Sequence, residues 1–172
     1  MRRSVLSSLA LASAMLLVLA SSAFGAPNHR TITILDNCDG PSFNAALGPG
    51  ACSRAGGLTF EALNQSLARG GAPSWRFSPS RATLAAGGSV TAVNRGGEFH
   101  TFTEVAAFGG GCVPPINAGL GLSPVPECAD PSLFGTTGVI PGGALEVGPI
   151  ASGAHRFQCL IHPWQRTTVT AR

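Results

Sequence analysis

Short runs of alternating or β-branched residues, separated by Gly and Pro, most constrain what this chain can fold into. Glycine and proline account for 23 and 13 of the 172 residues, and many of them fall at turns between strand-like runs. Seven such runs stand out, at 31–35, 75–77, 82–84, 89–94, 144–147, 155–159 and 167–170. Strands at these short intervals predict an all-β fold, an antiparallel Greek-key β-sandwich.

Helix-like periodicity occurs in one segment, Leu58–Arg69. Phe60, Leu63 and Leu67 fall on one face of that helix, and a Gly-Gly pair ends it. The long segment 106–133 is rich in Gly and Pro, and we expect it to be an irregular loop insertion. The predicted fold is therefore a sandwich with one short helix and disulfide-tied loop insertions.

The N-terminus has the features of a secretory signal peptide. Arg2 and Arg3 precede an apolar run from Val5 to Ala20, and small residues follow it at 21–26. We assign 1–25 to the signal peptide, although cleavage after Ala23, Gly25 or Ala26 fits the pattern. A membrane anchor is the alternative, but the run is short and is interrupted by serines, among them Ser8 and Ser13. We expect a secreted or periplasmic protein, with no membrane insertion after cleavage and a single domain over 26–172.

The charge of the chain excludes some classes of partner. Charged residues make up 11% of the sequence, the formal net charge is +3, and there is no basic run. Neither nucleic acid nor an anionic membrane is an expected partner. We expect a monomer.

Five cysteines in an exported chain leave one unpaired. Cys38 and Cys52 bracket one turn-rich segment, and Cys112 and Cys128 bracket another, so we predict these two disulfides. Four cysteines allow three pairings, so the connectivity remains an expectation. The remaining Cys159 is then a metal ligand, an inert buried thiol or an intermolecular bridge.

The surroundings of Cys159 favour a metal site. His162 follows three residues later, Gln165 three after that, and His100 lies some sixty residues upstream. One thiolate and two imidazoles are the donors of a trigonal copper electron-transfer site. The axial position, usually a thioether, falls to Gln165, because Met1 and Met15 both lie in the signal peptide. Cys-His-His plus an oxygen also suits zinc.

The segments Phe77-x-Pro79, 87–94, His100-Thr-Phe-Thr and 153–164 resemble a cupredoxin of the plastocyanin/amicyanin group. The resemblance implies a cupredoxin-like sandwich, with His100, Cys159 and His162 binding one type 1 copper. It covers about Trp75 to Arg172 but not the segments 28–72 and 106–133. We assign 73–172 as the copper-binding core and 26–72 as an N-terminal extension. Gln165 departs from the Met of short-loop relatives, although glutamine is an accepted axial ligand in stellacyanin-like members.

Three residues near the ligands are given supporting roles. Pro163 should stiffen the ligand loop and restrain His162. Asn94 either hydrogen-bonds across the loop holding Cys159 or is an ordinary turn residue. Trp164 is packed or exposed, and we favour an apolar docking surface around His162 and Trp164 for a redox protein.

The other candidate ligands have ordinary interpretations. We expect His29 and Glu98 to be solvated, Glu98 as a loop residue. His155 should be a core residue with satisfied hydrogen bonds, because its side chain points to the same side of the strand as those of Phe157 and Cys159.

We expect a small one-electron carrier that is not an enzyme, because an oxidase would need further domains and more than the four histidines present. The alternatives are a copper-buffering protein of the cell envelope and a metal-free structural domain.

Overall fold

A computed structural model describes residues 25–172 of the protein. The predicted signal peptide, 1–25, therefore lies almost entirely outside the described residues. Within the described part, no helix is long and apolar enough to cross a membrane.

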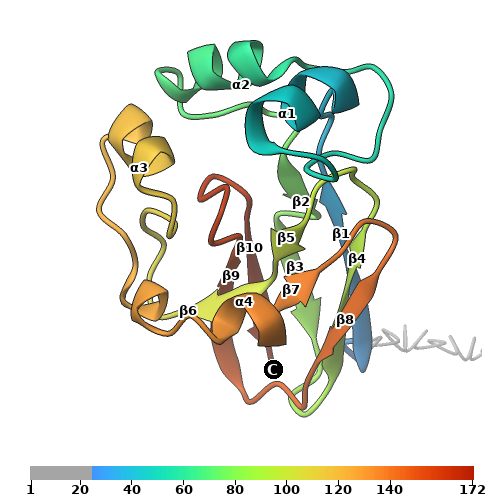
Figure 1. The fold of residues 1–172 in the computed structure, drawn as a ribbon. Helices are drawn as coiled ribbons and strands as arrows, with labels where there is room; N and C mark the ends of the chain where they lie inside the picture. The colour runs from blue at the N-terminus through green and yellow to red at the C-terminus, as the bar shows by residue number, and fades with distance from the viewer. Residues whose placement is uncertain (1–24) are drawn as a thin grey trace, which may run out of the picture.

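Two four-stranded sheets pack face to face (Figure 1). Their strand orders are β2-β1-β4-β8 and β3-β10-β9-β6, and β5 and β7 form a separate pair. The bounds are β1 His29–Leu35, β2 Arg76–Ser78, β3 Arg81–Leu84, β4 Ser89–Asn94, β5 His100–Thr101, β6 Thr103–Val105, β7 Gly138–Val139, β8 Ala144–Val147, β9 Gly153–Gln158 and β10 Arg166–Ala171.

Alternation along the strands builds the core between the sheets. On β1, Ile32 and Ile34 are fully buried, and on β4 every second residue is buried. Phe102 stacks on Phe157 of β9 with ring centroids 4.4 Å apart. Each large apolar side chain buried in this way stabilises the fold by roughly 1.5–3 kcal/mol.

The sandwich is mixed rather than antiparallel, which corrects the predicted topology. β1 runs parallel to β4, and β10 runs parallel to β3. Parallel neighbours need a crossover of a dozen or more residues, and 36–88 supplies one between β1 and β4. The period-two pattern that predicted the strands is the same for both directions, so it could not show this.

Helices are more numerous than the one predicted. The predicted helix is present as α2, Phe60–Leu67, but α1, Gly40–Leu47, and α3, Pro114–Leu120, were expected as turns and loop. A 3₁₀ turn, η1 (Pro126–Ala129), and a short helix, α4 (Leu133–Thr136), follow α3. The Asp39 side chain caps α1 by accepting from Ser42 N at 3.1 Å, and prolines occupy the first turns of α1 and α3. These are helix-start signals that the turn-like composition obscured.

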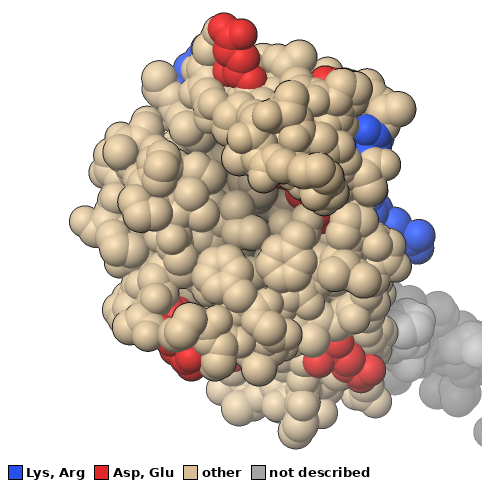
Figure 2. All heavy atoms as spheres, in the orientation of Figure 1, with Lys and Arg blue, Asp and Glu red and all other residues tan. Residues whose placement is uncertain are grey.

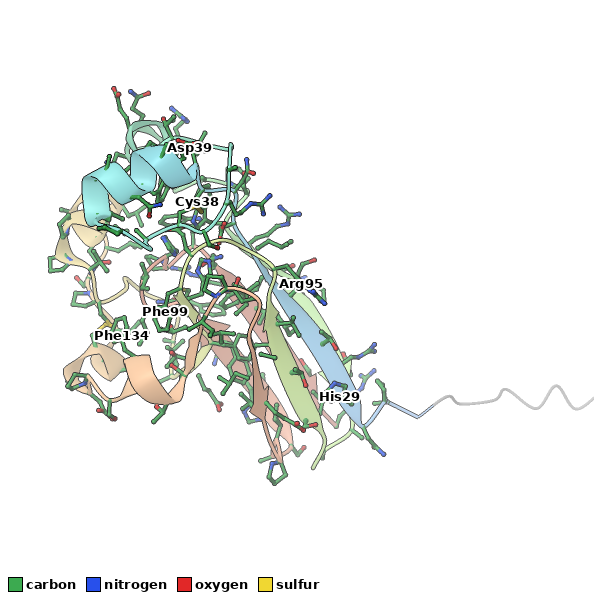
Figure 3. All side chains as sticks on the ribbon, turned by 45° about the vertical axis from the view of Figure 1, so that its right-hand side comes forward. His29, Cys38, Asp39, Arg95, Phe99 and Phe134 are labelled. Carbon is green, nitrogen blue, oxygen red and sulfur yellow. A yellow bond between two sulfur atoms is a disulfide. The ribbon has the colours of Figure 1, made fainter. Side chains whose placement is uncertain are left out.

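The predicted N-terminal extension is divided by the structure. Its first strand, β1, lies inside a sheet between β2 and β4, while α1 and α2 gather with α3 at one end of the sandwich (Figure 1). Figure 3 shows His29 at one end of the strands and Cys38 and Asp39 at the other, beside α1.

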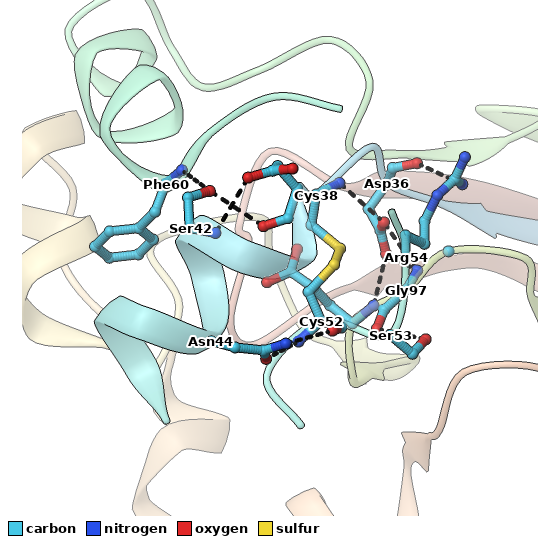
Figure 4. Close-up of a disulfide and its surroundings, with 12 residues drawn as sticks. Asp36, Cys38, Ser42, Asn44, Cys52, Ser53, Arg54, Phe60 and Gly97 are labelled. Carbon is cyan, nitrogen blue, oxygen red and sulfur yellow. Dashed lines mark hydrogen bonds between the residues drawn. A yellow bond between two sulfur atoms is a disulfide. The ribbon is translucent and has the colours of Figure 1, made fainter. Parts of the chain in front are cut away.

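Both predicted disulfides are present. Cys38–Cys52 joins the segment between β1 and α1 to the loop after α1 (Figure 4), and Cys112–Cys128 closes the loop that contains α3. Cys159 is the free cysteine of the described residues. Each loop closure is worth about 3 kcal/mol in the chain-entropy model.

Candidate metal centre

The loop between β9 and β10 carries three of the four candidate ligands. It starts at Cys159, directly after β9, and ends at Gln165, directly before β10. Cys159 N donates to Gln165 O at 3.1 Å, and Gln165 N donates to His162 O at 2.8 Å. These bonds close the loop on itself and hold its side chains in a fixed arrangement.

The fourth candidate, His100, comes from β5 and completes a triangle. Cys159 Sγ lies 3.8 Å from His100 Nδ1 and 3.9 Å from His162 Nδ1, and the two Nδ1 atoms are 3.3 Å apart. A point about 2.1 Å from all three atoms follows from these distances, and structural zinc keeps roughly 2.0–2.3 Å from nitrogen and sulfur. The donor set therefore fits one transition-metal ion.

The electrostatics of the triangle favour the thiolate. Burial raises the pKa of the Cys159 thiol, but hydrogen bonds and charge from His100 and His162 outweigh burial and hold the pKa well below its usual range. Cys159 is fully buried, as is His100, and His162 is 3% exposed. A buried thiolate beside two imidazoles is a ligand set from which water is excluded.

Asp36 orients His100, a role that the sequence did not reveal. Its Oδ2 lies 2.9 Å from His100 Nε2, and neither side chain is exposed. The backbone N–H groups of Gly97 and Glu98 also donate to this carboxylate, at 2.9 and 3.0 Å. Since Nε2 faces the carboxylate, Nδ1 is the nitrogen left to bind metal, as in carboxylate–histidine–metal arrangements.

The Asp36–His100 pair shifts both pKa values. Burial raises the pKa of Asp36, but the hydrogen bonds from His100, Gly97 and Glu98 lower it to about 2. Burial lowers the pKa of His100, but Asp36 and the Cys159 sulfur raise it to about 9. In the metal-free protein His100 therefore holds a proton that a metal ion would displace.

Gln165 has one satisfied and one unsatisfied amide atom. Its Nε2 donates to Leu35 O at 2.9 Å, which fixes the amide orientation because a carbonyl can only accept. Its buried Oε1 has no hydrogen-bond partner among the described residues. A buried oxygen without a partner costs about 1–3 kcal/mol, and coordination to a metal would offset that cost.

Asn94 hydrogen-bonds beside His100 and not across the loop holding Cys159, which was one of the two roles considered for it. Its Nδ2 donates to Glu98 O at 2.7 Å and to Val139 O at 2.9 Å. Asn94 ends β4, and its amide bonds one carbonyl in the turn that leads to His100 and one on β7, the strand paired with β5. The bond to the Cys159 loop comes instead from Thr101, whose Oγ1 accepts from Leu160 N at 2.8 Å. Pro163 is buried in the loop, and its predicted restraint on His162 stays a prediction.

The predicted docking surface around His162 and Trp164 stays a prediction, and neither side chain is fully exposed. His162 is buried, and the half-buried Trp164 donates its Nε1 to Ala72 O at 3.0 Å. Helices α1, α2 and α3 cover this end of the sandwich (Figure 1). The sequence around the candidate ligands does not predict these helices, because they come from distant segments of the chain.

Glu98 is buried rather than solvated. It is 6% exposed, and its Oε2 accepts from the indole N–H of Trp75. Burial, the largest effect, raises the pKa of Glu98 above its usual value. Glu98, Asp36 and Cys38 also lie close together, but Cys38 is in a disulfide and offers no thiolate, so this cluster is not a second metal site.

The remaining histidines lie outside the centre. His29 is exposed, as expected, and its Nδ1 lies 3.1 Å from Ser89 Oγ. His155 is not in the core: it is half-buried on β9, with Nδ1 2.7 Å from Glu104 Oε1. The alternation of side chains along the strand predicted correctly that Phe157 is buried. His155 points to the same face of β9, but that face is open to solvent near the start of the strand.

Comparisons with known proteins give distant likenesses. No family model matches the sequence, and no curated protein matches it. Among solved structures, the chain is similar to a purple cupredoxin from Nitrosopumilus maritimus, with 15% identity, a TM-score of 0.42, and 83% of this chain and 99% of that one covered.

Two other solved structures are a mutant amicyanin in the Cu(I) state and a mutant fern plastocyanin. The first is 18% identical over 56% of this chain and 73% of that one, and the second is 17% identical over 57% and 89%, both with TM-scores of 0.37. The chain thus resembles solved cupredoxins. Likenesses this distant carry no argument about what it binds, so the case for a metal rests on the geometry above.

Proposed function

We propose that this protein binds one copper ion in a type 1 centre and carries single electrons outside the cytoplasm. The observation that supports this best is the buried triangle of Cys159, His100 and His162, with donor atoms 3.3–3.9 Å apart. Two disulfides beside one free, buried cysteine fit an oxidising compartment in which that thiol is kept for a metal.

Each ligand has a defined role in this function. Copper supplies a one-electron couple when bound, and a thiolate with two imidazoles suits both oxidation states. Asp36 holds the ring of His100, Thr101 holds the start of the Cys159 loop, and the hydrogen bonds within the loop hold His162. Because these supports come from the fold, the ligands need little movement when the electron enters or leaves.

Gln165 is proposed as the axial ligand, through Oε1. Its buried, unpartnered oxygen supports this role. An amide oxygen is a harder donor than a thioether, so it stabilises Cu(II) relative to Cu(I). A redox protein is the proposed partner, docking on the face around His162, with this protein acting as a monomer.

Copper buffering is the second candidate, because all three main donors are almost completely buried. Cys159 and His100 are fully buried and His162 is 3% exposed, so an outside redox partner reaches the metal through the covering helices. A buffer would bind copper without exchanging electrons rapidly.

Voltammetry of the copper-loaded mature protein separates these functions. The electron carrier should show a reversible one-electron wave with one copper per chain, and Cys159→Ser should abolish the wave. Stoichiometric copper without a reversible wave indicates the buffer. No stoichiometric copper, or tighter binding of zinc in a colourless site, contradicts the proposal.

A further inference from the structure

Three helices enclose an apolar cavity next to His162. Its volume is about 330 Å³, and Figure 2 shows a hollow at the centre of this face, between the positions of α1 and α3 in Figure 1. The walls come from α1, α2 and the α3 segment, and include Phe43, Phe60, Leu63, Leu67 and Ile116. Both segments outside the resemblance, 28–72 and 106–133, thus contribute to one cavity.

Two polar atoms on residues that line the cavity lack hydrogen-bond partners. His162 Nε2 and Glu98 Oε1 are 3.9 Å apart, too far for a hydrogen bond. The other oxygen of Glu98 is already taken by Trp75, and neither unpaired atom has a hydrogen bond to any described residue. Both side chains are more than nine-tenths buried. An acceptor oxygen and a ring nitrogen therefore lie 3.9 Å apart without a hydrogen bond in an otherwise apolar space.

We propose that this cavity binds a small uncharged phenol, whose hydroxyl bridges Glu98 Oε1 and His162 Nε2. A hydroxyl is both donor and acceptor, so one group satisfies both atoms. The ring of the ligand would pack against Phe60 and Trp164, which line the cavity. A volume of 330 Å³ is at the lower end for small-molecule sites and suits a single ring.

The charges of the lining define the ligand further. Glu98 is its one charged residue, and Figure 2 shows no Lys or Arg around the hollow. An anionic ligand would be buried beside a carboxylate without a counter-ion, which is unfavourable. This inference adds a small-molecule class to the proposed function, and it is tested on metal-free protein so that each can fail alone.

The test compares p-cresol with p-xylene, which has a methyl group where p-cresol has the hydroxyl. Isothermal titration calorimetry on the metal-free mature protein should show p-cresol binding at least about tenfold more tightly than p-xylene, because only p-cresol satisfies the two polar atoms. In ¹H–¹⁵N spectra, p-cresol should shift the Trp164 indole signal.

Two cavity-filling variants and one matched control complete the test. Ile116→Phe and Asn64→Phe each place a ring in the cavity lining and should weaken p-cresol binding at least about tenfold. Asn64 is exposed on α2, so this variant should fold even if the other does not. Ile140→Phe makes the first change at an exposed isoleucine outside the lining and should leave binding unchanged.

Four results would overturn the proposal: no binding of p-cresol, equal binding of p-xylene, tighter binding of benzylammonium, or binding that survives both filling variants. If the protein binds p-cresol but takes up no copper, the phenol site is supported and the proposed copper function is contradicted. A copper electron carrier that binds no phenol would do the reverse.

Discussion

Gln165 is the residue whose environment is hardest to explain without a metal. It is fully buried, its Nε2 is paired with Leu35 O, and its Oε1 has no hydrogen-bond partner in the described part of the chain. By contrast Gln158, also fully buried and just before Cys159, has both amide atoms bonded, to Gly109 N and Gly110 O. The difference between the two glutamines supports the proposal that the oxygen of Gln165 binds the metal.

Replacing Gln165 by Met should raise the reduction potential and leave copper bound. A thioether favours Cu(I) more than an amide oxygen does, and ~59 mV corresponds to a factor of ten for a one-electron couple, so a change of that order is expected. Voltammetry of the parent, Gln165→Met and Gln165→Ala measures it.

Gln158→Met is the matched control for that experiment. It removes a buried amide with satisfied hydrogen bonds, so it should reduce stability and leave the potential close to that of the parent. If Gln165→Met and Gln165→Ala both keep the parent potential, Gln165 does not touch the metal.

The candidate ligands were predictable from the sequence, and the residues that hold them in place were not. Cys159, His162 and Gln165 are three residues apart in a short loop, so local spacing is enough to find them. Asp36 stands in the turn-like sequence Asp-Asn-Cys-Asp-Gly, 64 residues before His100. Its contact with His100 depends on how distant strands pair, which local patterns do not contain.

Among the secondary-structure elements, seven of the ten strands in the described residues match predicted runs, because alternation marks a strand with one buried face. The other three, β5, β6 and β7, lie outside those runs. Strand β4 covers the predicted run 89–94, and its residues alternate between buried and half-buried. Helices α1 and α3 were missed because Pro and Gly near their starts resemble turn signals. The starts of both helices can be recognised by a proline in the first turn, after the N-cap residues Asp39 and Val113.

The segment after α2 packs closely against the ligand loop at Gly71. A Cβ atom at Gly71 would overlap the ring of Trp164, whereas one at Gly70 would meet no atom within 4 Å. Both glycines have positive φ, at 97° and 91°, so an alanine is strained at either position.

Gly71→Ala should therefore cost about 1–3 kcal/mol more stability than Gly70→Ala, because it adds a steric clash to the same backbone strain. By displacing Trp164 it should also shift the visible bands of the copper-loaded protein, and Gly70→Ala should not. Urea unfolding and absorption spectra of the two variants test this. Equal stability and identical spectra would show that Trp164 does not hold the ligand loop.

The whole molecule brings the site together through its mixed topology. β1 pairs in parallel with β4, with Ile34 opposite Asn94, so the residues that follow each strand meet at the same edge. Asp36 thereby reaches the backbone of Gly97 and the ring of His100. An antiparallel arrangement, as predicted from the strand pattern, would have placed these residues at opposite ends of the sheet.

Asp36 should make the stability of the metal-free protein depend on pH in the acid range. Its pKa falls from 3.8 to about 2 on folding, so its contribution is present above pH 3.8 and is lost as the pH falls toward 2. At pH 5 the parent should exceed Asp36→Asn by about 2 kcal/mol, and this difference should shrink at pH 2.5.

Urea unfolding of both proteins at the two pH values measures that difference. Glu146→Gln, at an exposed carboxylate on β8, serves as control and should show no comparable change. A difference between the parent and Asp36→Asn that is the same at both pH values would mean that Asp36 acts by packing alone and not through its charge.

The visible absorption spectrum of the oxidised, copper-loaded mature protein tests the central claim most directly. One copper bound by Cys159, His100 and His162 should give an intense thiolate-to-copper charge-transfer band at one equivalent of Cu(II), and Cys159→Ser should abolish it. A strongly coloured Cys159→Ser protein, or a parent that binds Cu(II) without this band, would contradict the account.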